Sequence, residues 1–325
     1  MTNISGTNLT SHLKDSSTED EEWRTAITNA MIAIIINSIT CPFTVLLNLS
    51  VIMAVQRRPR LQSKTNILLA FLAATDVLTG LVVQPSFILF KTLEILGVPF
   101  YDLVRQFHNS CLRAMSICSS LHLMLVTLER LIAIKFTMQY PYVVRRRNIK
   151  AAVISFWIFV MFYESARLIL NTVQLYFNLL VAFVLLSCIL FVLFSYVNLY
   201  RETLRHRKRM KTQQLPAAEV ERFAKESKAL KTTVLLVGAV TTCYLPISLG
   251  VLQSQIRILS LSPDSVADST PCMACPWVRT FAMLNSLLNP LIYCCRQKEM
   301  RQFVFRFFPQ AVAPQSDSTT PATNC

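Results

Sequence analysis

The sequence predicts an all-α membrane protein: a bundle of seven transmembrane helices followed by a short amphipathic helix. Composition is the first observation, because 53% of the 325 residues are apolar, 15% are charged and the mean hydropathy is +0.44. An average soluble protein carries about 25% charged residues, so this chain lacks the polar surface of a soluble enzyme or a disordered protein. The second observation is that only 5 glycines occur, which favours long helices over a turn-rich β-barrel.

The third observation is a series of seven apolar runs, each long enough to cross the bilayer core, which takes about 20 helical residues. Helices are expected because lipid offers the backbone no hydrogen-bond partner. The chain is accordingly divided into an extracellular tail (1–26), a seven-helix domain (27–294), a membrane-surface helix (295–308) and a cytoplasmic tail (309–325). The predicted spans are Ile27–Val55, Asn66–Phe90, Val104–Ile134, Ala151–Leu170, Phe177–Tyr200, Thr232–Leu252 and Trp277–Cys294.

Basic residues are concentrated on one side of the predicted membrane domain. Clusters of Lys and Arg follow the first, third, fifth and seventh spans, whereas the N-terminal tail is acidic. Because cytoplasmic loops are enriched in Lys and Arg, we expect an extracellular N-terminus and a cytoplasmic C-terminus in the plasma membrane. This explains the net charge of +14 without nucleic acid as a partner, and the sequence has no nucleic-acid-binding motif. Asn3 and Asn8 are glycosylation candidates on the extracellular tail.

The segment after the last span predicts a helix that lies on the inner membrane surface. Met300, Phe303, Val304 and Phe307 would form one apolar face, and basic residues would form much of the rest. A helix of this kind lies in the boundary between lipid and water.

Polar side chains within the spans are the candidates for function, because polar and charged groups are costly in lipid. Asp76 lies in the middle of the second span, and Arg130 lies at the inner end of the third span in a Glu-Arg-Leu sequence. The sixth span contains a Cys-Tyr-Leu-Pro sequence that ends at Pro246. The seventh span closes with Asn-Pro-Leu-Ile-Tyr, from Asn289 to Tyr293.

In these landmarks and their order, the chain resembles the rhodopsin-like (class A) G-protein-coupled receptors from about Asn48 to Phe308. The resemblance implies a receptor that transmits the binding of an extracellular ligand to a heterotrimeric G protein, with arrestin and membrane lipids as further partners. It also implies a sodium ion beside Asp76 as an allosteric modulator, and hard oxygen ligands suit such an ion. A hydrogen-bonded water network without the ion is the alternative. The matching ligand positions are Ser119, Asn285, Ser286 and Asn289.

The same resemblance implies a switch at the inner end of the bundle. Arg130 would pair with a carboxylate, either its neighbour Glu129 or Glu226 of the sixth helix, and breaking the pair would open a cleft for a partner helix. Glu226 as a solvated charge is the alternative. Pro246 would kink the sixth span so that its inner half can swing. The residues implied in coupling are Glu129, Arg130, Glu226, Tyr244, Pro246, Asn289, Pro290 and Tyr293.

Several departures from the family pattern narrow the resemblance. Arg105 stands where the family usually has a Cys, the short loop near Asn171–Leu175 contains no Cys, and the fifth span lacks its usual Pro. These features resemble the melanocortin, cannabinoid and lysosphingolipid branch. By the same resemblance, Cys272 and Cys275 would close a small disulfide loop on the outer side. Two free thiols are the alternative.

The outer halves of the spans indicate the class of ligand. Leu112 stands where amine receptors have an Asp, and Met283 stands where opsins have a Lys, so an amine and retinal are both disfavoured. The outer half is instead rich in arginine, which favours an anionic lipid or an acidic peptide. The alternative is that Arg113 and Glu164 only form an ion pair with each other. The residues expected to line the pocket are Arg113, Glu164, Tyr244 and Arg279.

A transporter or channel and a membrane enzyme are the alternatives to a receptor. A transporter or channel would use Asp76 and Arg130 along an ion path, and the sequence lacks the paired half-repeats typical of such proteins. A membrane enzyme is not expected, because no phosphate loop, His-Glu-x-x-His or Gly-x-Ser-x-Gly motif occurs. No metal site beyond the sodium site and no other cofactor is expected.

Overall fold

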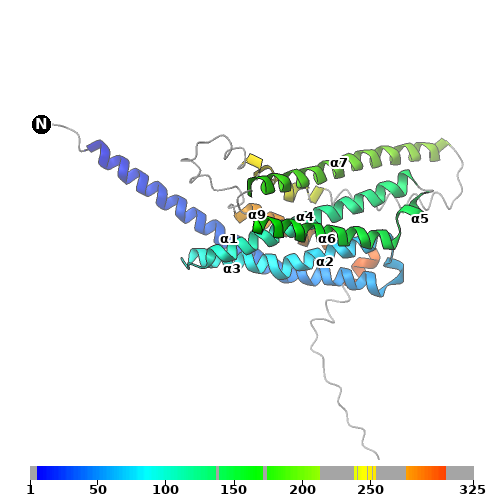
Figure 1. Ribbon diagram of the computed structural model, residues 1–325, viewed down its shortest axis with the longest axis horizontal. Coiled ribbons are helices and arrows are strands. Elements are labelled where there is room, and N and C mark those ends of the chain that lie inside the picture. The colour runs from blue at the N-terminus through cyan, green and yellow to red at the C-terminus, as the bar shows by residue number, and fades with distance from the viewer. Residues whose placement is uncertain are drawn as a thin grey trace, which may run out of the picture.

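The computed structural model describes residues 6–136, 139–170, 174–212, 238–239, 241–246, 248–250, 252–253 and 276–304. Its long helices lie side by side in an elongated bundle (Figure 1). The first helix, α1 (Gly6–Arg57), is 52 residues long, and its N-terminal part projects away from the bundle (Figure 1). The helix therefore begins well before the apolar run predicted from Ile27 and includes much of the polar N-terminal tail.

The second predicted span consists of three consecutive segments: α2 (Lys64–Leu78), the π-helical turn η2 (Thr79–Val83) and α3 (Gln84–Ile95). The side chain of Ser63 caps α2 by accepting a hydrogen bond from the backbone N–H of Asn66 at 3.2 Å. The π-helical turn ends just before Pro85, whose ring crowds the preceding turn of a regular α-helix. Gly80 lies where α1 passes closely: a Cβ added there would be 2.7 Å from Cγ2 of Val45.

The centre of the bundle is the long helix that begins at Tyr101. This helix, α4, packs against α2, α3, α6 and α7, while α9 packs against α1 and α2. The bounds of the remaining helices are η1 Pro59–Leu61, α4 Tyr101–Lys135, α5 Tyr140–Val143, α6 Arg146–Ile169, α7 Gln174–Thr212 and α9 Pro276–Arg296.

The described helices agree with the predicted spans. Those that are long and apolar enough to cross a membrane, within the part of the chain that the structure describes, coincide with the first five predictions, and α9 coincides with the seventh. Within the sixth predicted span, residues 238–239, 241–246 and 248–250 are helical, and its remaining residues lie outside the described part apart from residue 252, which is also helical. The all-α prediction is therefore confirmed. The five stretches are Trp23–Arg57, Lys64–Ile95, Tyr101–Ala133, Arg146–Ile169 and Tyr176–Glu202.

The bundle carries apolar side chains on its outside and holds several polar residues buried within it. On α6, Ile154, Ile158 and Phe162 recur at every fourth position, which places them on one face, and they are 57%, 65% and 74% exposed. Asp76 and Asn289 are instead fully buried. This distribution suits a protein whose surroundings are lipid, because lipid accepts apolar surface and does not solvate polar groups.

The predicted helix after the last span is present at residues 298–304. Met300 and Val304 are buried. Met300 belongs to the main hydrophobic core of the bundle, and Phe303 packs against that core. Gln297 joins this helix to α2, because its Nε2 donates to Oδ1 of Asn66 at 3.2 Å. Part of the apolar face predicted to lie on the membrane thus packs against the protein itself.

Candidate functional site

Asp76 of α2 lies fully buried at the centre of the bundle. Its Oδ2 accepts a hydrogen bond from Nδ2 of Asn289 of α9 at 2.8 Å. One turn earlier on α9, the backbone carbonyl of Ser286 accepts a hydrogen bond from Nδ2 of Asn48 of α1 at 3.0 Å. These contacts join α1, α2 and α9 around one buried carboxylate.

The central site contains more buried oxygens than the described residues satisfy. Within the described part of the chain, Oδ1 of Asp76, Oδ1 of Asn285 and Oδ1 of Asn289 have no hydrogen-bond partner. Ser119 of α4 and Ser286 of α9 are buried as well. Buried polar atoms are nearly always satisfied, so this set of oxygens fits water or a hard cation such as sodium.

Tyr244 lies with the central site. Its hydroxyl accepts a hydrogen bond from Nδ2 of Asn285 at 3.4 Å, and its side chain is buried. Tyr244 was predicted to belong to both the switch and the ligand pocket, and this contact joins it to the buried Asp76 site. Pro246 follows in the same helical stretch, and Pro290 lies inside α9. Tyr293 is fully buried on the same helix.

A second polar cluster lies at the predicted inner end of α4. Glu129 accepts two hydrogen bonds, from Oγ1 of Thr65 at 2.8 Å and from the hydroxyl of Tyr140 at 2.7 Å. Nε of Arg130 is 3.4 Å from Oε2 of Glu129, and its guanidinium also donates to Oγ1 of Thr65. The ammonium of Lys64 lies 4.4 Å from the centre of the Tyr140 ring. The cluster therefore ties α4 to the start of α2 and to α5.

Of the two carboxylates considered for Arg130, Glu129 is in contact with it, while Glu226 lies outside the described residues. Thr65 and Tyr140 were not identified from the sequence. The sequence does show that Thr65 lies in the first turn of an apolar span, since it follows the capping residue Ser63. Its contact with Glu129 and Arg130 is visible only in the structure. Tyr140 begins the four-residue helix α5, which lies between two predicted spans and is too short for hydrophobic periodicity to indicate which way a side chain faces.

The arginines of the predicted outer end are gathered around one carboxylate. Nε of Arg113 on α4 is 3.3 Å from Oε1 of Glu164 on α6, and Nε of Arg167 is 3.2 Å from Oε2 of the same residue. Both guanidinium groups also donate to Oγ of Ser110, at 3.2 Å and 2.7 Å. The ion pair between Arg113 and Glu164 that the sequence analysis kept as an alternative is thus present.

Arg279 of α9 is buried against Phe90 of α3. Its side chain is 5% exposed, and its guanidinium carbon lies 5.1 Å from the centre of the Phe90 ring. The Phe90 ring also packs on the ring of His108, at 5.1 Å between centres. Nδ1 of His108 is 3.1 Å from Oγ of Ser86. The outer end therefore combines guanidinium groups with aromatic rings.

Some predicted sites lie outside the described residues: Asn3, Glu226, Cys272 and Cys275. Asn8 belongs to the first turn of α1. Among the residues that the structure describes, no group of three or more His, Cys, Asp or Glu side chains could hold a metal ion.

Comparison with known proteins decides the family. Residues 47–176 and 160–293 match the family described as "7 transmembrane receptor (rhodopsin family)". The chain belongs to this family. Together these residues include Asp76, Arg130 and the Asn289–Tyr293 segment, which carried the resemblance.

Similar individual receptors come from more than one branch of the rhodopsin family. Melanocortin receptor 5 of Homo sapiens is 22% identical over 267 residues, covering 78% of this chain and 77% of that receptor. The alpha-1A adrenergic receptor of Homo sapiens is 26% identical over 310 residues, covering 80% and 64%. Trace amine-associated receptor 5 of Mus musculus is 28% identical over 294 residues, covering 83% and 80%. The first lies in the branch that the loop and cysteine pattern indicated.

This rhodopsin-family chain is a G-protein-coupled receptor and a multi-pass membrane protein. The family consists of signalling receptors, which are not enzymes, and its members couple to G proteins. The similarity gives no support to the transporter or channel that was the alternative.

Proposed function

We propose that this receptor binds an anionic extracellular ligand at the arginine cluster of its outer end. The observation that carries the proposal is that Arg113 and Arg167 share the single carboxylate of Glu164, at 3.3 Å and 3.2 Å. Charge-assisted N–H···O contacts are usually shorter, at about 2.7–2.9 Å. Arg113 contacts both oxygens of Glu164, at 3.3 Å and 3.4 Å, and Arg167 shares one of them. One carboxylate therefore balances only one of the two guanidinium charges, and a carboxylate or phosphate of a ligand would supply a second anion.

The alternative is that the cluster only holds α4 against α6 as a structural ion pair. Two cations around one anion make a poor structural pair, because removing charge from water is costly unless it is matched. Arg279 adds a third buried guanidinium at this end, against the ring of Phe90. The combination supports a ligand with an acidic group and an apolar part.

The proposal is tested in cells that carry second-messenger reporters, with fatty acids, lysophospholipids, acidic peptides and amines as probes. We expect an acidic probe to activate the receptor, and Arg113→Gln and Arg279→Gln to lower its potency at least about tenfold, as loss of one partner of a buried charge pair does. Arg105→Gln is the matched control, because Arg105 forms an exposed pair with Asp102 at 2.6 Å. Unchanged potency in the two buried variants at matched surface expression, or activation by an amine alone, would overturn the proposal.

An extracellular ligand at this end requires an extracellular N-terminus and a cytoplasmic C-terminus in the plasma membrane. The distribution of Lys and Arg in the loops supports this orientation. We expect an antibody to bind an N-terminal tag on intact cells and a C-terminal tag only after permeabilisation. Detection of both tags on intact cells would contradict the orientation.

At the inner end, we assign to Arg130 the role of the coupling switch. Its contacts with Glu129 and Thr65 hold its guanidinium against α2, in an arrangement that suits the resting receptor. Releasing these contacts would free the guanidinium for a helix of the G protein in a cleft at this end. Arrestin would bind the same face. Pro246 and Pro290 interrupt helical hydrogen bonding and so allow the helices to bend.

The central oxygens support a sodium ion as a modulator of this switch. Asp76 would hold the ion, with Ser119, Asn285, Ser286 and Asn289 as the further oxygen donors. A bound cation would neutralise the buried carboxylate and satisfy oxygens that have no described partner.

A further inference from the structure

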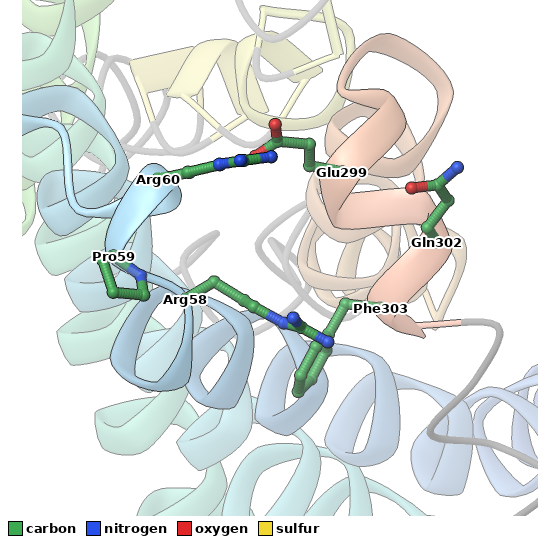
Figure 2. A pocket seen from close by; sticks show the side chains of 6 residues that line it. All are labelled: Arg58, Pro59, Arg60, Glu299, Gln302 and Phe303. Atoms are coloured by element: carbon green, nitrogen blue, oxygen red, sulfur yellow. The ribbon is translucent and has the colours of Figure 1, made fainter.

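The inner end carries a cavity that neither the switch nor the central site uses. It has a volume of about 530 Å³ and lies between the loop after α1 and the helix at residues 298–304. Figure 2 shows Arg58, Pro59 and Arg60 on one wall, and the opposite wall is formed by Glu299, Gln302 and Phe303. Its volume falls within the range of about 300–1,000 Å³ typical of small-molecule sites.

The wall that carries the arginines is a fixed turn. The backbone N–H of Leu61 donates to the carbonyl of Arg58 at 2.9 Å, and Gln62 donates to Pro59 at 3.1 Å. Leu61 is 4% exposed, so the turn is anchored in the core. Pro59 restricts the backbone further. The arginine side chains thus start from a backbone that is already ordered.

The lining combines two cations with one anion. The guanidinium carbon of Arg58 lies 5.8 Å from the centre of the Phe303 ring. In Figure 2, the side chain of Arg60 extends toward Glu299 across the cavity. The flanking residues Lys298 and Arg301 add positive charge around Glu299 on the same helical segment. An anion in the cavity would therefore contact Arg58 and compete with Glu299 for Arg60.

We propose that this cavity binds the headgroup of a phosphorylated phosphatidylinositol from the cytoplasmic leaflet. Arg58 directly follows the apolar stretch Trp23–Arg57, which is long enough to cross a membrane. The proposed orientation would therefore place Arg58 beside the headgroups of the inner leaflet. The cytoplasmic leaflet is rich in anionic lipids, and basic pockets at its surface bind their headgroups. Arginine forks match phosphate oxygens, and two arginines at separate points favour a headgroup with more than one phosphate. The inference rests on the orientation proposed above, and not on the extracellular ligand.

The experiment measures binding of a fluorescent phosphatidylinositol bisphosphate to the purified full-length receptor in phosphatidylcholine nanodiscs. We expect the double variant Arg58→Gln, Arg60→Gln to weaken binding at least about tenfold, and Glu299→Gln to strengthen it by removing the competing carboxylate. Arg205→Gln is the control, since Arg205 is an exposed arginine on α7 paired with Glu202. The unfolding temperature of each variant establishes that it is folded.

Equal affinity of the double variant and the unaltered receptor would overturn the proposal. So would equal affinity for phosphatidylserine, or equal affinity for free inositol trisphosphate, which would point to a soluble anion. Because the readout is lipid binding without ligand or G protein, its failure would leave the proposed ligand site and switch untouched.

Discussion

At the scale of single residues, Thr65 connects the two charged groups of the inner site. A hydroxyl can donate and accept at once, and that of Thr65 donates to Glu129 and accepts from Arg130. Glu129 and Arg130 are visible in the sequence because two charges end an apolar run. Thr65 stands 64 positions before Glu129, and only the packing of α2 on α4 makes it their partner.

In the central and outer sites, too, some contacts follow from the sequence and others only from the packing. The hydrogen bond between Asp76 and Asn289 joins residues 213 positions apart, and no hydrophobic periodicity pairs them. Asp76 and Asn289 were predicted to lie together only because the family resemblance implies it. An ion pair between Arg113 and Glu164 was predicted from their opposite charges, as the alternative to a pocket for an anionic ligand. The sharing of Glu164 with Arg167 depends on side-chain directions that a sequence does not contain.

The sodium proposal makes a prediction about Asp76. The purified receptor should unfold at a temperature several degrees higher in sodium chloride than in choline chloride, because an ion that binds only the folded state stabilises it. Asp76→Asn should abolish this difference, since it removes the charge that holds the ion. Asp102→Asn is the control, because Asp102 is an exposed carboxylate paired with Arg105. Equal unfolding temperatures in the two salts, or a sodium effect that persists in Asp76→Asn, would contradict the sodium site.

At the scale of helices, the second span is the least regular described element. It passes through the π-helical turn Thr79–Val83 between α2 and α3. This turn brings Gly80 against α1, and the thiol of Cys41 contacts the carbonyl of Gly80 at 3.1 Å. Close backbone approach therefore depends on the absence of a side chain at Gly80.

Gly80→Ala should destabilise the receptor. The added Cβ would lie 2.7 Å from Val45 and 3.3 Å from Thr44, so α1 must shift. Overpacking of this kind costs about 1–3 kcal/mol, which should lower the unfolding temperature of the purified receptor by several degrees. Gly238→Ala is the matched control, because a Cβ there would meet no atom of the described residues within 4 Å. The packing argument fails if the two variants unfold at the same temperature.

The helices were largely predictable because one physical requirement sets them. A backbone in lipid must satisfy its own hydrogen bonds, so each long apolar run predicts a helix. The ends were not predictable on this basis, since α1 begins at Gly6 and α7 continues to Thr212, both in polar sequence where the requirement no longer applies. The π-helical turn was missed because an apolar run does not distinguish one helical form from another.

At the scale of the whole molecule, the receptor has polar sites at three depths along an apolar bundle. The arginine cluster joins α4 to α6, the Asp76 site joins α2 to α9, and the Arg130 site joins α4 to α2. The central helix α4 packs against α2, α3, α6 and α7 and carries residues of all three sites: Arg113, Ser119 and Arg130. A ligand that rearranges the outer contacts can therefore bias the inner ones through a shared rigid element.

The central claim is that Glu129 and Thr65 hold Arg130 in the resting receptor. The most direct test measures guanine-nucleotide exchange on a panel of G proteins without any ligand. Glu129→Gln should raise exchange about tenfold, because a hydrogen bond to a charged group contributes roughly 1.5–3 kcal/mol, and adding Arg130→Ala should abolish the rise. Glu202→Gln, which removes the partner of the exposed Arg205, should leave exchange unchanged. No rise in Glu129→Gln at matched expression, or a rise that survives the loss of Arg130, would contradict the claim.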